Sequence, residues 1–323
     1  MSLTESIKDK ARELGFDLVG VTTADPLSAE DQAHFEAWLR RDCAAGMPWM
    51  QRNAGKRLAP AVLLSGARSV ICTATAYGPL PGEPLPASGG PHGRIADYAR
   101  FDDYHVFLRE RLFALADAIS QLAGGTRRRF KICVDSAPLA ERSVARRAGL
   151  GFIGKNHMLT NERLGSQLLL GEIVTDLPLD PDPPASTPCG DCVRCIKACP
   201  AGAIRTDGRF DASRCISYLT IEHDGPVDRQ LAGAIGNRLF GCDECVRSCP
   251  FTQSAPHRPL HVPPPRRPCW LSLSDVMAWS EQEFERCFGG SPVQRLGLQR
   301  LRRNAEICLA NAGGRPFHGK KMS

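Results

Sequence analysis

The chain has 323 residues, of which 42% are hydrophobic and 24% are charged, the composition of an ordinary globular protein with room for two or three domains. Its formal net charge of +6 is a mild excess that selects no class of partner by itself. No apolar run is long enough to span a bilayer, and the N-terminal run MSLTESIKDKARELGF mixes acidic and basic residues instead of forming a signal peptide. We therefore expect a cytoplasmic protein with no membrane partner.

Helix and strand patterns alternate over the first half of the chain. Leu3, Ile7 and Ala11 recur at helical spacing, whereas SVICTATAY at 69–77 and QLLLGEIVT at 167–175 are apolar runs typical of buried strands. The patterns predict helices at 3–14, 35–41, 103–122 and 138–147, and strands at 17–23, 69–77, 130–135 and 167–175. The Gly- and Pro-rich run at 78–93 is interpreted as a surface loop.

Two Pro-rich stretches divide the chain into three parts. PLDPDPPASTP at 178–188 and APHRPLHVPPPRRP at 255–268 have the composition of linkers. They predict a first domain at 1–177, a cysteine-rich module at 178–255 and a helical segment at 256–323. The fold class that follows is α+β, with a mixed sheet flanked by helices in the first domain.

The chain contains fourteen cysteines, which we do not interpret as a disulfide framework because no signal peptide is expected. Eight of them fall in or beside two related motifs, CGDCVRCIKACP and CDECVRSCP. The other six lie mostly in apolar contexts and are predicted to be inert thiols: Cys43, Cys72, Cys133, Cys269, Cys287 and Cys308.

The first motif has the C-x2-C-x2-C-x3-C-P spacing of bacterial ferredoxins, in which the fourth cysteine binds the other of two [4Fe–4S] clusters. The second motif lacks one cysteine, which Cys215 in RCISYLT would supply. This crossing rule assigns Cys189, Cys192, Cys195 and Cys249 to cluster one, and Cys199, Cys215, Cys242 and Cys245 to cluster two. Zinc is the alternative for C-x2-C pairs, and eight cysteines with two C-P endings argue against it.

The stretch after the strand at 130–135 is the most informative one outside the cysteine motifs. The strand delivers Asp135 to its C-terminal end, where the carboxyl could serve chemistry or cap the helix that follows Pro138. Gly149, Gly151 and Gly154 form a turn that could let the backbone approach a flat or anionic ligand. Because a helix precedes this turn, G-x-G-x-x-G here does not indicate a dinucleotide fold.

Arginines gather near the C-terminus, in the run QRLGLQRLRRN. Two interpretations remain open for them, a solvated surface and a patch that faces nucleic-acid phosphates. They are Arg295, Arg300, Arg302 and Arg303.

Residues 135–179, the cysteine motifs, RCISYLT and GNRLFGCDECVRSCP together resemble the epoxyqueuosine reductase family. GKRLAPAVLLSGARSV and GRIADYARFDDYH resemble that family's N-terminal motifs, so the resemblance extends from about residue 5 to about residue 312. It implies a cobalamin-binding catalytic domain at 1–177, a ferredoxin module and a truncated helical-repeat tail. It also implies reduction of epoxyqueuosine to queuosine in tRNA, the last step of queuosine biosynthesis.

The resemblance implies a role for particular residues. Asp135 matches the family's proton donor, and we expect its pKa to be raised by burial beside the corrin. Thr220, Glu222 and His223 lie where they could meet the nucleoside. The positions that match cobalamin contacts, besides Asp135, are Arg57, Lys155, Asn156, Ser217, Cys242 and Asp243. No D-x-H-x-x-G signature occurs, which fits the base-off cobalamin binding of the family.

The expected partners are a tRNA with a GUN anticodon that carries epoxyqueuosine, and an external electron donor such as a ferredoxin or flavodoxin. Asp97, His157 and Gln167 depart from the family pattern and could tune the pocket or mark a divergent paralogue. Two alternatives stay open: a reductive dehalogenase-like cobalamin enzyme acting on a small molecule, and a ferredoxin-type electron carrier without a catalytic pocket.

Overall fold

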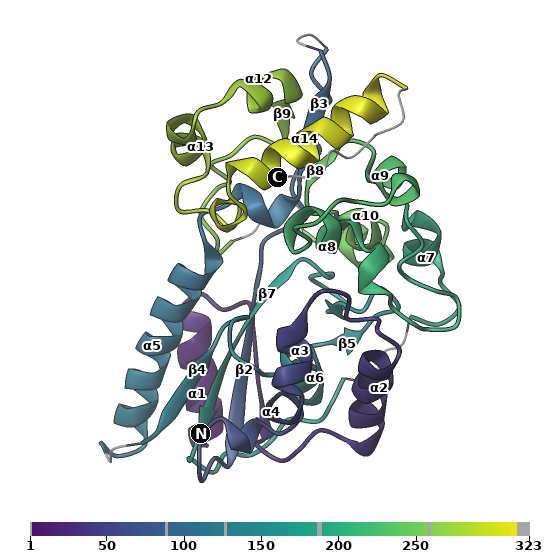
Figure 1. The fold of residues 1–323 in the computed structure, drawn as a ribbon. Helices are drawn as coiled ribbons and strands as arrows, with labels where there is room; N and C mark the ends of the chain where they lie inside the picture. Colours follow the sequence, from purple (N-terminus) through teal and green to yellow (C-terminus); the bar gives the residue numbers. More distant parts are fainter. Residues whose placement is uncertain (1, 88–89, 126–127, 186–188, 257–259, 315–323) are drawn as a thin grey trace.

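A computed structural model describes residues 2–87, 90–125, 128–185, 189–256 and 260–314. Its largest sheet has four strands in the order β1-β2-β7-β4, and all three pairings are antiparallel; Figure 1 labels β2, β7 and β4. The strands are β1 (Leu18–Thr23), β2 (Ser69–Ala76), β7 (Leu168–Thr175) and β4 (Phe130–Cys133). Each lies within a predicted strand and ends within two residues of the predicted boundary.

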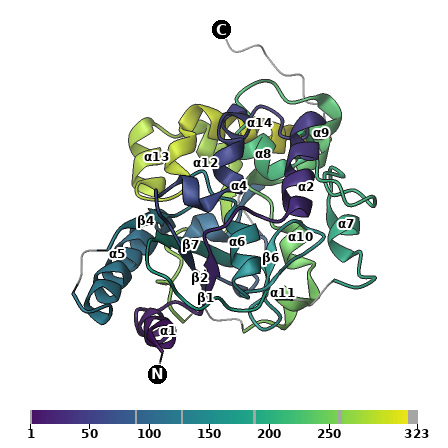
Figure 2. The same cartoon turned by 90° about the horizontal axis from the view of Figure 1, so that it is seen from below.

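Both faces of this sheet are covered, because successive side chains of a strand point to opposite faces. Ile71 and Ile173 pack with α1 (Leu3–Glu13) and α5 (Tyr104–Leu122) on one face. Val70 and Val174 pack on the other face, against α6 (Glu141–Arg147). Figure 2, viewed from below, shows α1 and α5 on one side of the sheet and α6 on the other. The central strands are therefore buried along nearly their whole length and rich in apolar and β-branched residues, which is why the sequence identified them.

A second, three-stranded sheet joins the three predicted parts of the chain. Its order is β8-β3-β9, with β3 (His92–Ile95) parallel to β8 (Arg238–Phe240) and antiparallel to β9 (Trp270–Ser272). Each strand comes from a different predicted segment, and one hydrophobic core surrounds the sheet. The segment boundaries stay predictions, and parts of both linkers, at 186–188 and 257–259, lie outside the described residues.

The α+β class is confirmed, but the strand pairing corrects our expectation of a mixed sheet in the first domain. The sheet of the first domain is antiparallel, and the mixed pairing lies in the small sheet. The sequence missed β3, at the end of an expected loop, and β9, in a segment expected to be helical. Both strands are too short for an alternating pattern to stand out. Glycine at position 93 of β3 allows close packing, since a Cβ there would lie 2.8 Å from Leu239 Cβ.

The C-terminal helix α14 (Leu298–Ala312) packs on the small sheet and on α12 (Leu273–Ala278) (Figure 1). No helix among the described residues is long and apolar enough to cross a membrane. The remaining α-helices are α2 (Ala29–Arg40), α3 (Pro48–Arg52), α4 (Ala54–Leu58), α7 (Arg194–Ala198), α8 (Ile216–Ile221), α9 (Arg229–Ile235), α10 (Glu244–Arg247), α11 (Pro250–Ser254) and α13 (Glu281–Phe288).

Candidate functional site

One hollow in the surface is lined by the four cysteines that the crossing rule assigns to cluster one. They come from the loop before α7, from α7 itself and from the N-terminus of α11, so residues far apart in the sequence meet here. Thr160 and Phe251 complete part of the wall. The hollow's cysteines are Cys189, Cys192, Cys195 and Cys249.

The four cysteines assigned to cluster two also lie close together. Burial raises the pKa of the Cys245 thiol well above its usual range, and the neighbouring sulfur atoms raise it further. Those neighbours are Cys242, Cys215 and Cys199. Four thiols this close together form the kind of ligand set that holds a [4Fe–4S] cluster.

Lys155 and Asn156 hold the two cysteine loops against the first domain. The Lys155 backbone N–H lies 3.4 Å from Cys189 Sγ, and its Nζ donates to the Gly190 carbonyl at 2.7 Å. Asn156 is buried, and its Nδ2 donates to the Cys245 carbonyl at 3.5 Å. These two residues therefore connect the Gly-rich turn to both cysteine groups, a contact that sequence reasoning did not identify.

Asp135 follows β4 in a left-handed backbone conformation, with φ at 51°, which is uncommon for a residue other than glycine. Its carboxylate accepts a hydrogen bond from the Tyr104 hydroxyl at 3.1 Å and lies 3.4 Å from His105 Nε2. The side chain is 63% exposed, so one side of the carboxylate is open to a ligand. It does not cap α6, because the N-cap position is Ala140 and no side chain bonds there.

The charges that the protein itself places around Asp135 act on its pKa, whereas the rise expected from burial beside the corrin stays a prediction. The interaction with His105 lowers the pKa of the Asp135 carboxyl, against burial, which acts to raise it. The shift to higher pKa falls instead on Glu141, whose carboxyl reaches a pKa of about 8 through burial and repulsion from Asp135. Glu141 also accepts a hydrogen bond from the Asp135 backbone N–H. Among these protein neighbours, Asp135 is therefore the more acidic of the two carboxyls.

Arg57 lies at the end of α4, close to the same two carboxylates. Burial lowers the pKa of its guanidinium, and the charges of Glu141 and Asp135 act in the opposite direction. Its carbonyl accepts a hydrogen bond from the Ala140 N–H at 3.1 Å, whereas its Nε is buried without a protein partner. A buried donor in this state is available to a ligand.

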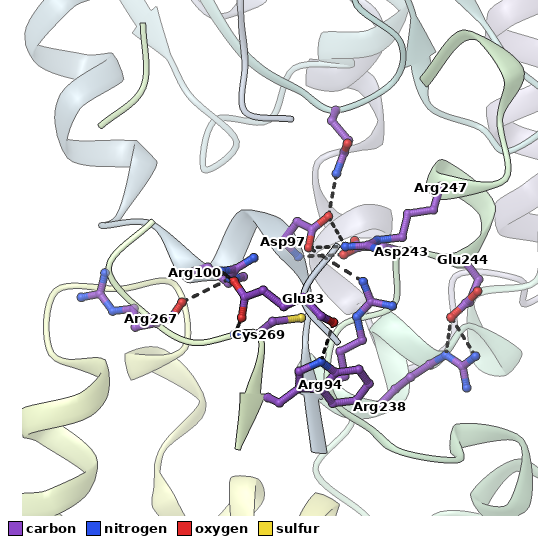
Figure 3. A network of polar contacts seen from close by, with 12 residues as sticks. Glu83, Arg94, Asp97, Arg100, Arg238, Asp243, Glu244, Arg247, Arg267 and Cys269 are labelled. Atoms are coloured by element: carbon purple, nitrogen blue, oxygen red, sulfur yellow. Dashed lines mark hydrogen bonds and ion pairs between the residues drawn. The ribbon is translucent and has the colours of Figure 1, made fainter. Parts of the chain in front are cut away.

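Asp97 and Asp243 meet where the first domain contacts the cluster-two loop (Figure 3). The Asp97 side chain is 1% exposed, and both its oxygens accept from Arg247 Nη2, at 2.6 and 2.7 Å. Its backbone N–H donates to Asp243 at 2.7 Å. Burial and the charge of Asp97 raise the pKa of Asp243 to about 6. Asp97 is therefore a buried ion-pair partner that links the two parts, and Gln167 donates to it at 3.1 Å.

The structure corrects our expectation for Thr220. Thr220 is fully buried, donates to the Ile216 carbonyl at 2.7 Å and accepts from the Gly241 N–H at 3.0 Å, so it supports the backbone before Cys242 and does not reach a substrate. Ser217, three residues earlier in α8, is half-buried beside Cys215.

Glu222 and His223, which follow α8, are held by the C-terminal segment. The Glu222 carboxylate forms an ion pair with Arg295 at 2.5 Å, and the His223 carbonyl accepts from Arg303 at 2.6 Å. Buried Asn304 donates to the Thr220 carbonyl at 2.9 Å. Two C-terminal arginines therefore hold this loop, and of these Arg303 is buried and is not part of a solvated surface, whereas the paired Arg295 side chain stays 56% exposed.

Comparison with known proteins places these features in one family. Residues 57–136 match the family described as epoxyqueuosine reductase QueG, DUF1730, and residues 188–252 match the 4Fe-4S double cluster binding domain. The epoxyqueuosine reductase of Xanthomonas campestris is 40% identical over 95% of this chain and 86% of its own length. That of Escherichia coli is 38% identical over 96% of this chain and 81% of its own length.

Solved structures agree with the sequence matches. The epoxyqueuosine reductase of Streptococcus thermophilus superposes with a TM-score of 0.86 at 32% identity, covering 96% of this chain and 82% of that one. An epoxyqueuosine reductase crystallised with an epoxyqueuosine-modified tRNA-Tyr stem loop superposes with a TM-score of 0.87 at 33% identity, covering 96% and 81%. The cysteine-rich part accordingly binds two [4Fe–4S] clusters. The chain belongs to the epoxyqueuosine reductase family.

Proposed function

We propose that the protein reduces the epoxide of epoxyqueuosine in tRNA to the alkene of queuosine, with Asp135 as the group that protonates the departing oxygen. The similarity to epoxyqueuosine reductases over nearly the whole chain carries this proposal. The reaction takes up two electrons and two protons and releases water. The open side of the Asp135 carboxylate supports its role, because a proton donor must reach the reacting oxygen.

We propose cobalamin as the second cofactor, beside the two clusters. Its corrin carries amide side chains and a phosphate, which need hydrogen-bond donors and acceptors from the protein. Arg57 Nε and Gln167 Oε1 are buried polar atoms without a protein partner, and both fit such groups. When bound, cobalamin supplies the redox-active cobalt from which the epoxide takes its electrons.

The remaining site residues are proposed to position these groups. Arg57 would donate to the rim of the corrin, and Lys155, Asn156, Ser217, Cys242 and Asp243 would form the surface between corrin and clusters. Glu222 and His223 would contact the nucleoside from the loop that Arg295 and Arg303 hold in place. The eight cysteines would bind the clusters in the two groups that the structure brings together.

We propose a tRNA with a GUN anticodon as the substrate, and a ferredoxin or flavodoxin as the external electron donor. The crystallised relative with a modified tRNA-Tyr stem loop supports the first partner, and the ferredoxin-type motifs support the second. A tRNA substrate would place the reaction in the cytoplasm. A small-molecule dehalogenase and a simple carrier are less well supported, because the similarity to epoxyqueuosine reductases extends through the first domain.

The test uses anaerobically purified protein loaded with both clusters and cobalamin, with epoxyqueuosine-containing tRNA and a strong reductant. Mass spectrometry of the digested tRNA should show queuosine. Asp135→Ala should keep the corrin absorption and lose about 100-fold or more of the rate, as expected for a general acid. Asp207→Ala, an exposed aspartate paired with Arg209, is the control and should match the wild type. Absence of queuosine with both cofactors bound would refute the function, and full activity of Asp135→Ala would refute the donor assignment.

A further inference from the structure

The contacts of Asp135 leave the origin of its proton to be explained. An exposed carboxyl has a pKa near 4 and is ionised at neutral pH, so it cannot hold a proton ready for the epoxide oxygen. Asp135 is 63% exposed, and its interaction with His105 lowers the pKa of its carboxyl further. A protonated neighbour beside Asp135 would supply the proton after the carboxyl has ionised.

His105 is placed to be that neighbour. Its Nδ1 lies 2.7 Å from Asp103 Oδ1, and its Nε2 lies 3.4 Å from Asp135 Oδ2, so each ring nitrogen faces a carboxylate. Only the imidazolium has an N–H on both nitrogens, and it is therefore the form that matches two carboxylate acceptors. The ring stacks on Tyr104 with centroids 4.2 Å apart, which fixes its plane.

We propose that His105 stores the proton that Asp135 delivers to the epoxide oxygen, as the middle member of an Asp103–His105–Asp135 relay. This inference rests on the proposed function. The His105 Nε2–H bond breaks as an O–H bond forms on Asp135, and that O–H bond breaks as the proton passes to the substrate oxygen. His105 is left neutral and Asp135 ionised. Solvent then recharges the ring, and the second proton of the water molecule follows the same route.

The charges around the ring support storage at neutral pH. Asp103 first, and then Asp135, raise the pKa of His105 to about 9, against burial. The facing groups from other elements are Arg295 and its partner Glu222, and the Arg295 charge acts to lower the pKa of both aspartates. His105 is therefore charged up to about pH 9, whereas a histidine without these partners is neutral above about pH 6.5.

The first measurement needs no cobalamin and no turnover. Histidine ring signals of the cluster-loaded protein are followed by NMR against pH, with His105→Gln identifying the signal. The His105 midpoint should lie near pH 9. In Asp103→Asn and in Asp135→Asn it should fall by at least about one pH unit, because each change removes one facing charge. A wild-type midpoint at or below the ordinary value of about 6.5 would overturn the proposal.

The second measurement is the pH profile of single turnover with epoxyqueuosine tRNA. The wild-type rate should persist to about pH 9 and fall above it, where the ring loses its proton. The single-turnover rate of His105→Gln should fall about tenfold for each unit of increasing pH, starting well below neutral pH, because Asp135 must then take its proton from solvent. His34→Gln, at an exposed position on α2, is the matched control.

The outcomes separate the relay from the function on which it rests. If the wild type makes no queuosine, the proposed function fails whatever the NMR titration shows. If the wild type is active and His105→Gln has the same profile, the relay is refuted and the function stands. If His105→Gln folds poorly, Asp103→Asn serves instead, because it keeps the His105 ring. The pH at which the rate of Asp103→Asn falls on the basic side of its pH profile should then be lower than in the wild type. A purely structural role would leave that pH unchanged.

Discussion

For the buried ion pair of Asp97 and Arg247, we predict that removing Arg247 destabilises the protein more than removing the Asp97 charge. Arg247→Met leaves the Asp97 carboxylate, 1% exposed, without its main counter-charge and beside the second carboxylate of Asp243. Removing one partner of a buried pair costs about 3–5 kcal/mol when the remaining charge cannot reach water. Asp97→Asn leaves Arg247, which is 30% exposed and can turn to solvent or to Asp243. We expect that change to cost about 1–2 kcal/mol, the range of a hydrogen bond weakened at a partly exposed partner.

Thermal unfolding of cluster-loaded protein at matched iron content measures the difference. At about 2 °C per kcal/mol for a chain of this size, Arg247→Met should lower Tm by about 6–10 °C and Asp97→Asn by about 2–4 °C. The double variant should be more stable than Arg247→Met alone, because no buried charge is left unpaired. Arg94→Met is the matched control: because Arg94 lies 4.0 Å from Asp97, this variant should lower Tm less than Arg247→Met does.

The reasoning would be refuted by either of two results. Arg247→Met could prove no more destabilising than Asp97→Asn or Arg94→Met, which would mean that the Asp97 charge reaches water in the folded protein. Alternatively, the two changes could add without coupling, which would mean that the ion pair contributes nothing beyond its separate groups.

Two further predictions concern the C-terminal helix and the clusters. Asn304→Ala should lower the free energy of unfolding by about 2–4 kcal/mol, because it leaves the buried carbonyls of Thr220 and Leu239 without a hydrogen-bond donor. The control is Asn311→Ala, which also loses two hydrogen bonds to carbonyls but at a partly exposed position, so it should cost clearly less in the same melting experiment. Equal losses in the two variants would contradict this account. Cys249→Ala should lose about half of the bound iron, because it removes a ligand of cluster one, whereas the control Cys43→Ala should lose none. Iron content and electron paramagnetic resonance measure the loss. Full iron content in Cys249→Ala would contradict the assignment of Cys249 to a cluster.

The sequence predicted the features that depend on local pattern. The strands at 69–77 and 167–175 were recognisable because both faces of the sheet are buried, so most of their residues are apolar or β-branched. The cysteine spacing predicted two groups of four, and the fold brings the same groups together, because short spacings allow the chain few ways to surround a cluster. The short strands β3 and β9 were missed, since their pairing comes from partners more than a hundred residues away in sequence.

The site shows the same division between local and long-range information. Asp135 stood out in the sequence as a carboxylate at the end of a strand, but its contact with His105 could not be predicted, because it joins the start of α5 to the loop after β4. The C-terminal arginines were ambiguous for the same reason. Their charge was evident, whereas Arg303 is 8% exposed and binds backbone carbonyls of another segment.

The sequence by itself therefore determined the central strands, the two-cluster module and the family, and it predicted the cluster ligands. These depend on residue type and spacing along the chain, which a single sequence contains. Only the tertiary structure decided the ionisation of the site, because a pKa depends on the charges and burial that surround a group in space. Asp135 is the acidic carboxyl, Glu141 the protonated one and His105 the charged ring because of neighbours that the fold brings to them.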